Sequence, residues 1–148
     1  MEKETLLMSA CLMGVACRYD GGAKTLPELP QLMARYHIVP VCGEAMGGLP
    51  MPRVPAERAD ERVLDREGTD VTAQFRRGAE QVLALARLYG AEKALLKERS
   101  PSCGSGRIYD GSFTGTLRDG WGITAELLRD AGVTVYGESR VQELLETD

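Results

Sequence analysis

The sequence predicts a three-layer α/β domain built around a mainly parallel sheet. Short apolar runs typical of buried strands alternate along the chain with segments in which apolar residues recur every three or four positions, as on one face of a helix. Alternation of this kind places right-handed helical crossovers over a parallel sheet. The chain has 148 residues, a length that fits one domain with a substantial core, so we expect residues 1–148 to form a single domain.

The first strand is predicted over Thr5–Ala10, a short apolar run that leads into a cysteine. A short helix follows over Leu29–Tyr36, where Pro30 suits the first helical turn. The second strand is predicted over His37–Val41 and again ends at a cysteine. Pro40 within it indicates an edge position or an early end, because proline cannot donate a hydrogen bond to a neighbouring strand.

The longest helix is predicted over Asp70–Tyr89, with Asp70 as its N-cap and Gly90 as its stop. Its apolar residues recur at steps of three or four along one face: Val71, Phe75, Ala79, Val82, Ala86 and Tyr89. A third strand is predicted within Ala91–Lys97. Before this helix, the proline-rich and charged stretch Leu49–Gly68 predicts a covering loop or small hairpin, and both a functional lid and a solvated connection are open.

The last predicted elements are a helix over Ile123–Ala131, closed by Gly132, and a strand over Val133–Tyr136. Ser139 and Gln142 have the spacing of a capping box at the start of a final helix. The complete order of strands and helices predicts a Rossmann-like arrangement.

Composition excludes several classes of protein. The formal net charge of -4 at pH 7 gives no basic surface for nucleic-acid phosphates, so we expect no nucleic-acid partner. The N-terminal stretch MEKETLLMSACLMG resembles neither a signal peptide nor a membrane-spanning helix. We therefore expect a cytoplasmic protein without membrane contact, and the sequence does not determine its oligomeric state.

The four cysteines are Cys11, Cys17, Cys42 and Cys103. Because disulfides are rare in the cytoplasm, these thiols point to metal binding or catalysis. His37 is the single histidine, so a zinc site with two histidines from one chain is excluded and a Cys–His nucleophilic pair would depend on His37 alone.

Cys11, Cys42 and Cys103 each follow a predicted strand. The carboxyl ends of parallel strands share one edge of a sheet, where ligands bind at the point of strand-order reversal, so the three thiols could converge. Soft thiolates select zinc, copper(I) or an iron–sulfur cluster, and three of them leave one coordination position open for chemistry. The simpler alternative is that buried cysteines act as small hydrophobic side chains.

Other candidates lie near these thiols. Cys17 is a possible fourth ligand or only a neighbouring thiol. Glu44 follows Cys42 by two residues and is a candidate acid/base, although an exposed carboxylate is more often merely solvated. Asp20 and Asp110 belong to a repeated Tyr-Asp-Gly motif, which favours a turn over a catalytic role.

Four stretches carry a more specific signal: SACLMGVACRYDGG (9–22), VCGEAMGGLPMPR (41–53), LKERSPSCGSGRIYDGSFTGTL (96–117) and GITAELLRDAGV (122–133). At these stretches the sequence resembles the thiouracil desulfidase family, long catalogued as a domain of unknown function, and the resemblance covers essentially the whole chain. The resemblance implies a [4Fe-4S] cluster with one open iron, held by Cys11, Cys42 and Cys103, and a small thiolated heterocycle as substrate. Glu44 and Ser100 match the catalytic carboxylate and serine of the family.

The resemblance implies a non-redox desulfidase reaction that converts C=S to C=O and releases sulfide. The open iron would act as a Lewis acid on the substrate sulfur, Glu44 would activate a water or shuttle protons, and Ser100 would hold the substrate or relay a proton. The family usually has Cys-Pro-Glu where this chain has Cys42-Gly43-Glu44. Glycine loosens that loop and puts the placing of Glu44 in question.

Two alternatives come from other classes of protein. One is a cluster-free redox or sulfur-transfer protein with Cys103 as nucleophile and Cys17 as resolving thiol, although the Cys-x-x-Cys spacing of thioredoxin-like proteins is missing. The other is a non-catalytic iron–sulfur binding module, which substrate turnover would distinguish from an enzyme.

Overall fold

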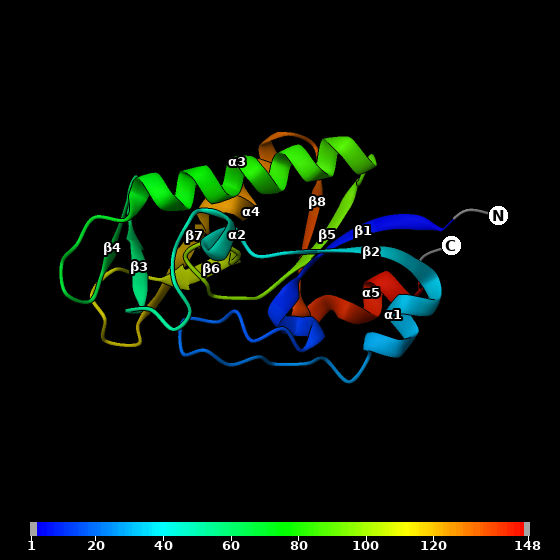
Figure 1. Ribbon diagram of the computed structural model, residues 1–148, viewed down its shortest axis with the longest axis horizontal. Coiled ribbons are helices and arrows are strands. Elements are labelled where there is room, and N and C mark those ends of the chain that lie inside the picture. Colours follow the sequence, from blue (N-terminus) through cyan, green and yellow to red (C-terminus); the bar gives the residue numbers. More distant parts are fainter. Residues whose placement is uncertain (1–2, 147–148) are drawn as a thin grey trace.

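A four-stranded parallel sheet forms the centre of the fold in the computed structural model, which describes residues 3–146 (Figure 1). In spatial order its strands are β2 (Tyr36–Val41), β1 (Glu4–Ser9), β5 (Lys93–Leu96) and β8 (Thr134–Gly137). Every neighbouring pair in this sheet is parallel, as the alternation of strands and helices predicts. β2, which contains Pro40, is an edge strand, as expected for a strand with a proline.

Helices cover both faces of the sheet (Figure 1). α3 (Thr72–Tyr89) and α4 (Ile123–Asp130) lie on one side, and α1 (Leu29–Arg35) and α5 (Val141–Glu146) lie on the other. Side chains alternate along a strand, so Leu7 of β1 packs with α3 and α4 while Leu6 and Met8 pack with α1 and α5. The fold is therefore the three-layer, Rossmann-like α/β arrangement that the sequence predicts.

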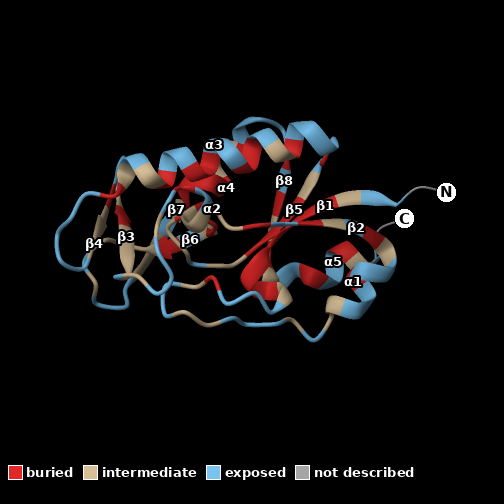
Figure 2. Cartoon of the chain, viewed as in Figure 1, coloured by how far each residue is buried: buried red, intermediate tan, exposed pale blue. Residues whose placement is uncertain are grey.

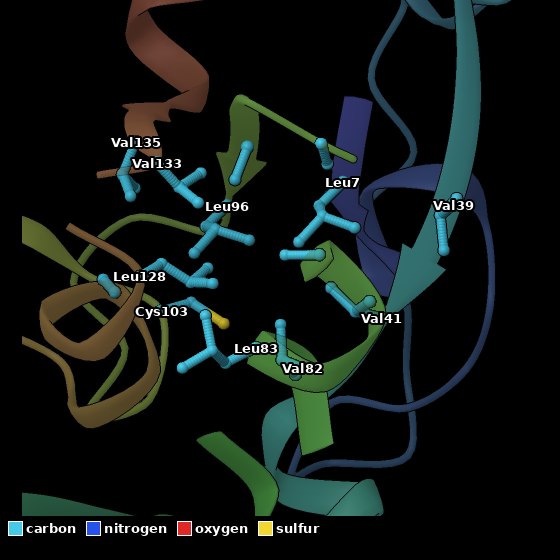
Figure 3. Packing of buried hydrophobic residues seen from close by; sticks show 14 residues of the cluster. Leu7, Val39, Val41, Val82, Leu83, Leu96, Cys103, Leu128, Val133 and Val135 are labelled. Carbon is cyan, nitrogen blue, oxygen red and sulfur yellow. The ribbon is translucent and has the colours of Figure 1, made fainter. Parts of the chain in front are cut away.

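The larger apolar core lies between the sheet and the α3–α4 layer. Figure 2 shows buried positions along the sheet-facing side of α3, with exposed positions on its outer side. Leu7, Val82 and Leu128 are completely buried there, and each such side chain stabilises the fold by about 1.5–3 kcal/mol. Cys103 belongs to the same cluster, beside Leu83 (Figure 3).

The ends of α3 match the prediction at one terminus and differ by two residues at the other. Gly90 ends the helix in the left-handed conformation with φ 64°, and its N–H bonds to the carbonyl of Ala86. Asp70 is not the N-cap, because the helix begins at Thr72 and the Asp70 carboxylate accepts the Thr72 N–H at 2.9 Å in a turn before the helix. The same carboxylate receives Arg62 Nε at 3.1 Å.

The predicted capping box before α5 is wrong. Ser139 lies within a short 3₁₀ helix, η2 (Glu138–Arg140), and Gln142 already lies in α5, while no side chain caps η2. The Ser139 hydroxyl instead donates to the carboxylate of Glu98, far away in sequence. The predicted capping box used only the local spacing of Ser139 and Gln142, whereas the Ser139 hydroxyl finds its acceptor in Glu98, at the edge of the sheet.

Two antiparallel hairpins lie outside the main sheet. β3 (Ala56–Ala59) pairs with β4 (Arg62–Asp65), so the stretch after Leu49 contains a small hairpin, one of its two predicted forms. β6 (Ser105–Tyr109) pairs with β7 (Leu117–Trp121), and the sequence pattern did not predict this hairpin. Glu57 joins the two, since its carboxylate accepts the N–H groups of Gly111 at 2.9 Å and Phe113 at 3.1 Å.

One short helix, α2 (Gly43–Met46), packs against α3 at unusually close range. A Cβ added at Gly78 of α3 would lie 1.6 Å from the carbonyl oxygen of Gly43, and one at Gly47 would lie 2.0 Å from the carbonyl oxygen of Gln74. Glycine is thus required on both sides of the contact, which fixes α2 against the long helix.

Among residues 3–146, no helix combines the length and apolar character needed to cross a membrane.

Candidate active site

The cysteines meet at the carboxyl edge of the sheet. The chain runs from β1 to β2 on one side and later places β5 on the other side of β1, so strand order reverses between β1 and β5. Cys11 lies just beyond β1 in the 3₁₀ helix η1 (Ala10–Met13), Cys42 follows β2 directly, and Cys103 lies in the loop after β5. All three, together with Cys17, line one cavity of about 670 Å³.

Hydrogen bonds orient two of these sulfurs. Cys42 is the N-cap of α2, and its Sγ accepts the N–H of Ala45 at 3.5 Å. The Ser9 hydroxyl, itself buried, donates to Cys103 Sγ at 3.6 Å. Sulfur is the acceptor in both contacts, and the Cys42 thiol in turn donates to the Cys17 carbonyl oxygen at 3.9 Å.

Burial dominates the acid–base behaviour of the thiols. Burial, with a smaller contribution from neighbouring Cys42, raises the pKa of Cys103 and of Cys17 to about 12 in each case, and both effects raise the pKa of Cys11. Without a bound cation these three groups are therefore neutral thiols near pH 7, and a metal that binds sulfur would have to displace their protons.

Cys17 joins the other cysteines in space. It is 4% exposed, its carbonyl oxygen lies 3.9 Å from Cys42 Sγ, and it lines the same cavity. The four cysteines are all free thiols. The position of Cys17 beside Cys42 agrees with both predicted possibilities, a further ligand and a neighbouring thiol.

The described residues contain no three His, Cys, Asp or Glu side chains close enough to share one metal ion. The cysteines nevertheless line one cavity, from three strand ends and one loop. Soft sulfur donors around a cavity of this size suit a thiolate-bound group such as an iron–sulfur cluster.

Glu44 is held on the cavity wall from two sides. Arg53 Nε donates to Glu44 Oε1 at 2.9 Å, and the Ser100 hydroxyl donates to Oε2 at 3.5 Å. The side chains of Arg53 and Glu44 are only 6% and 16% exposed, so the carboxylate is not merely solvated. Glu44 and Ser100, which are far apart in sequence, thus form a contact.

Ser100 also organises the loop that carries Cys103. Its hydroxyl oxygen accepts the N–H of Ser102 at 3.0 Å and that of Cys103 at 3.1 Å. The carbonyl of Ser100 accepts the N–H of Gly104 at 2.9 Å. The hydroxyl therefore fixes the Cys103 turn while its proton points to Glu44.

Arg53 is a site residue that the sequence analysis did not single out. Besides Glu44, its guanidinium donates to the carbonyls of Cys17 at 3.0 Å and Pro50 at 3.1 Å. It thereby ties the proline-rich stretch to the cysteine loop after β1. A signal was present, because a lone arginine within the largely apolar run Leu49–Pro55 needs a partner for its charge.

The remaining candidates do not converge on the cysteines as functional groups. Asp20 accepts the N–H of Gly22 at 2.9 Å, and Asp110 accepts that of Ser112 at 2.9 Å, so both side chains form the predicted turns. His37 lies near the start of β2, is exposed, and has its ring 6.4 Å from that of Tyr89 at a tilt of 42°, rather than lining the cavity. A Cys–His nucleophilic pair is not formed.

These features define a Rossmann-like α/β protein with a thiol-lined cavity at its switch point and one braced carboxylate on the wall. A family model described as 2-thiouracil desulfurase matches residues 6–140. The chain belongs to this family of desulfidases.

Two relatives extend the comparison. A protein of Bacillus subtilis (strain 168), the uncharacterized protein YbbK, is 37% identical over 150 residues, which cover 95% of this chain and 99% of that protein. The solved structure of the [4Fe-4S]-dependent thiouracil desulfidase TudS is 49% identical and superposes with a TM-score of 0.91, covering 96% of this chain and 95% of its own.

Proposed function

We propose that this protein is a [4Fe-4S]-dependent, non-redox desulfidase that converts C=S to C=O in a small thiolated heterocycle such as a thiouracil. The reaction consumes water and releases sulfide. The observation that carries the proposal is the meeting of Cys11, Cys42 and Cys103, from three strand ends, in one cavity whose wall holds the Glu44–Ser100 contact. Family membership and the iron–sulfur dependence of TudS support it.

The cysteines would hold the cluster as three thiolate ligands, which leaves one iron without a protein ligand. Two features of this chain fit an iron–sulfur cluster. Its ligands would be soft thiolates, and the cavity is larger than a single ion requires. When bound, a cluster with an open iron supplies a Lewis acid for the thiocarbonyl sulfur.

The protein's own acid/base group is Glu44. Because Oε1 is engaged by Arg53, the other oxygen, Oε2, is the one that can accept a proton from an attacking water. The same oxygen can return a proton to the substrate ring nitrogen. Arg53 keeps the carboxylate oriented through both steps.

Ser100 would serve Oε2 as a proton relay. Its oxygen already accepts two backbone N–H groups, so its own proton is directed toward Glu44 or toward a ligand in the cavity. This geometry also supports a positioning role, since the hydroxyl shapes the Cys103 turn.

Aromatic side chains form part of the cavity lining. Tyr109 and Phe113 are among the lining residues, and the Arg66 guanidinium lies 5.8 Å from the Phe113 ring centroid. Aromatic faces favour planar partners, and ligand cavities of about 300–1,000 Å³ suit small molecules. These residues support a heterocycle as substrate and give no preference for a nucleic acid or a membrane. A cytoplasmic location would suit the site, because a reducing compartment keeps the cysteines as free thiols.

The cluster-free alternative is weaker on the same observations. A nucleophilic cysteine needs a thiolate, whereas burial raises the pKa of Cys103 to about 12. No imidazole lines the described part of the cavity to assist it.

The test starts with anaerobic purification and measurement of colour, iron and acid-labile sulfide. We expect a brown protein that releases sulfide from 2-thiouracil. Replacing Cys11, Cys42 or Cys103 with serine should abolish the cluster, and Cys17→Ser serves as the matched control that keeps it. Glu44→Gln should keep the cluster and lose most turnover.

Each outcome separates the hypotheses. A colourless parent protein with full activity would overturn the cluster. An intact cluster without turnover of any thiolated pyrimidine would favour a non-catalytic binding module. Undiminished turnover in Glu44→Gln would remove the acid/base role.

A further inference from the structure

An ion pair on the cavity floor has no part in the proposed reaction. Lys97 follows β5 and Glu138 follows β8, so both lie at the carboxyl edge of the sheet and line the cavity. Lys97 Nζ donates to Glu138 Oε1 at 3.0 Å and to the Glu98 carbonyl at 3.4 Å. The two side chains are 20% and 14% exposed, which makes this a largely buried pair.

Lys97 is linked to one of the proposed cluster ligands. Its backbone N–H donates to Ser9 Oγ at 3.0 Å, and Ser9 in turn donates to Cys103 Sγ. Lys97 also lines the same cavity as Cys11. It therefore borders the space in which the cluster would be held.

Charge balance gives this arrangement a purpose. A doubly positive [4Fe-4S] core with three thiolates carries one net negative charge, and an anionic sulfur product would add to it. Buried charge is costly without a nearby opposite charge. We propose, on the basis of the function proposed above, that Lys97 is the electrostatic partner of the thiolate-bound cluster and that Glu138 positions its ammonium.

Two other cations that line the cavity are less suited to this role. Arg53 is committed to Glu44 and two carbonyls. Arg18 is half-buried in the loop after η1, and its guanidinium lies 5.8 Å from the Tyr19 ring centroid. Lys97 combines burial with a fixed partner.

The opposite charges of Lys97 and Glu138 allow a test that separates an electrostatic effect from structural damage. An electrostatic effect shifts the reduction potential in opposite directions in the two variants, whereas structural damage does not. Lys97→Met and Glu138→Gln break the same ion pair, but the first removes a positive charge and the second a negative one. We expect the reduction potential of the cluster to shift to more negative values in Lys97→Met and to more positive values in Glu138→Gln. Iron release to a chelator should be several-fold faster in Lys97→Met.

A matched control lies at the other end of the same strand. Lys93 begins β5, is also 20% exposed, and pairs with Glu4 at 3.2 Å. Lys93→Met should leave the potential and the iron-release rate as in the parent protein.

The measurement is an anaerobic redox titration of the holoprotein followed by electron paramagnetic resonance. Equal potentials in all variants, or shifts of the same sign in Lys97→Met and Glu138→Gln, would overturn the role of Lys97. A parent protein that contains no iron would instead contradict the proposed function, so the two failures are distinguishable.

Discussion

Replacing Arg53 with methionine tests whether the buried ion pair fixes Glu44. The variant keeps a long apolar side chain but leaves the carboxylate with only the 3.5 Å contact to Ser100. Removing one partner of a buried pair costs about 3–5 kcal/mol. Because Glu44 borders a cavity and is 16% exposed, we expect the lower end, about 3 kcal/mol.

For a chain of this length, about 3 kcal/mol corresponds to a fall of roughly 6–12 °C in Tm. Glu44→Gln should cost only about 1 kcal/mol, because the amide oxygen can still accept from Arg53 and the guanidinium keeps two carbonyl partners. In the double variant the two losses should not add, since the residues are in contact.

The assay is urea unfolding of the reduced, metal-free protein, so that loss of a cluster does not enter the midpoint. Arg62→Met is the matched control, because Arg62 pairs with Asp70 at 3.1 Å while the two side chains are 64% and 44% exposed. Exposed pairs contribute about 0–1 kcal/mol. Arg53→Met with the same midpoint as Arg62→Met would refute the reasoning.

Three further predictions concern the surroundings of the cysteines. Gly78→Ala should destabilise the protein by more than about 3 kcal/mol in urea unfolding, because the new Cβ would lie 1.6 Å from the Gly43 carbonyl oxygen, even though alanine favours helices. The control, Leu88→Ala at an exposed position, should change stability by less than about 0.5 kcal/mol. Equal effects of the two substitutions would contradict the packing argument. Ser9→Ala should keep the cluster but lower its reduction potential, because Cys103 Sγ loses a hydrogen bond; an unchanged redox titration would argue against that contact. Burial raises the pKa of Cys103 to about 12, so in the metal-free protein this thiol should react with iodoacetamide at pH 8 more slowly than glutathione does. Mass spectrometry measures the rate of alkylation, and a rate equal to that of glutathione would contradict the raised pKa.

Most of the sheet could be predicted because its strands are short apolar runs with clear ends. β1, β2 and β5 each end near a cysteine, so the parallel order was enough to predict that Cys11, Cys42 and Cys103 would share one edge. This convergence follows from topology and needs no side-chain detail.

The β6–β7 hairpin was missed because it lacks a readable pattern. Of its ten strand residues only Ile108 is buried, and polar or glycine positions surround it. The hairpin is held by contacts from elsewhere, including the Glu57 carboxylate. Such long-range support leaves little periodicity in the local sequence.

Arg53 and Ser139 show the same limit at the level of side chains. Arg53 meets Glu44 through a loop whose path depends on β3 and β4, and Ser139 meets Glu98 across two strand ends. Local spacing correctly predicted the helix stop at Gly90 and the turn at Asp110, but it does not predict which distant group will bind a side chain such as Ser139.

The glycine before Glu44 makes these distant contacts more important in this chain. A proline between Cys42 and Glu44 would restrict the backbone of this turn, whereas Gly43 leaves it unrestricted. The space around Gly43 is tight instead, since an added Cβ would lie 2.5 Å from the hydroxyls of Ser102 and Thr124. The orientation of Glu44 therefore depends on packing around α2 and on Arg53, rather than on a stiff backbone. Loss of Arg53 should consequently impair turnover more here than in a relative with proline at this position.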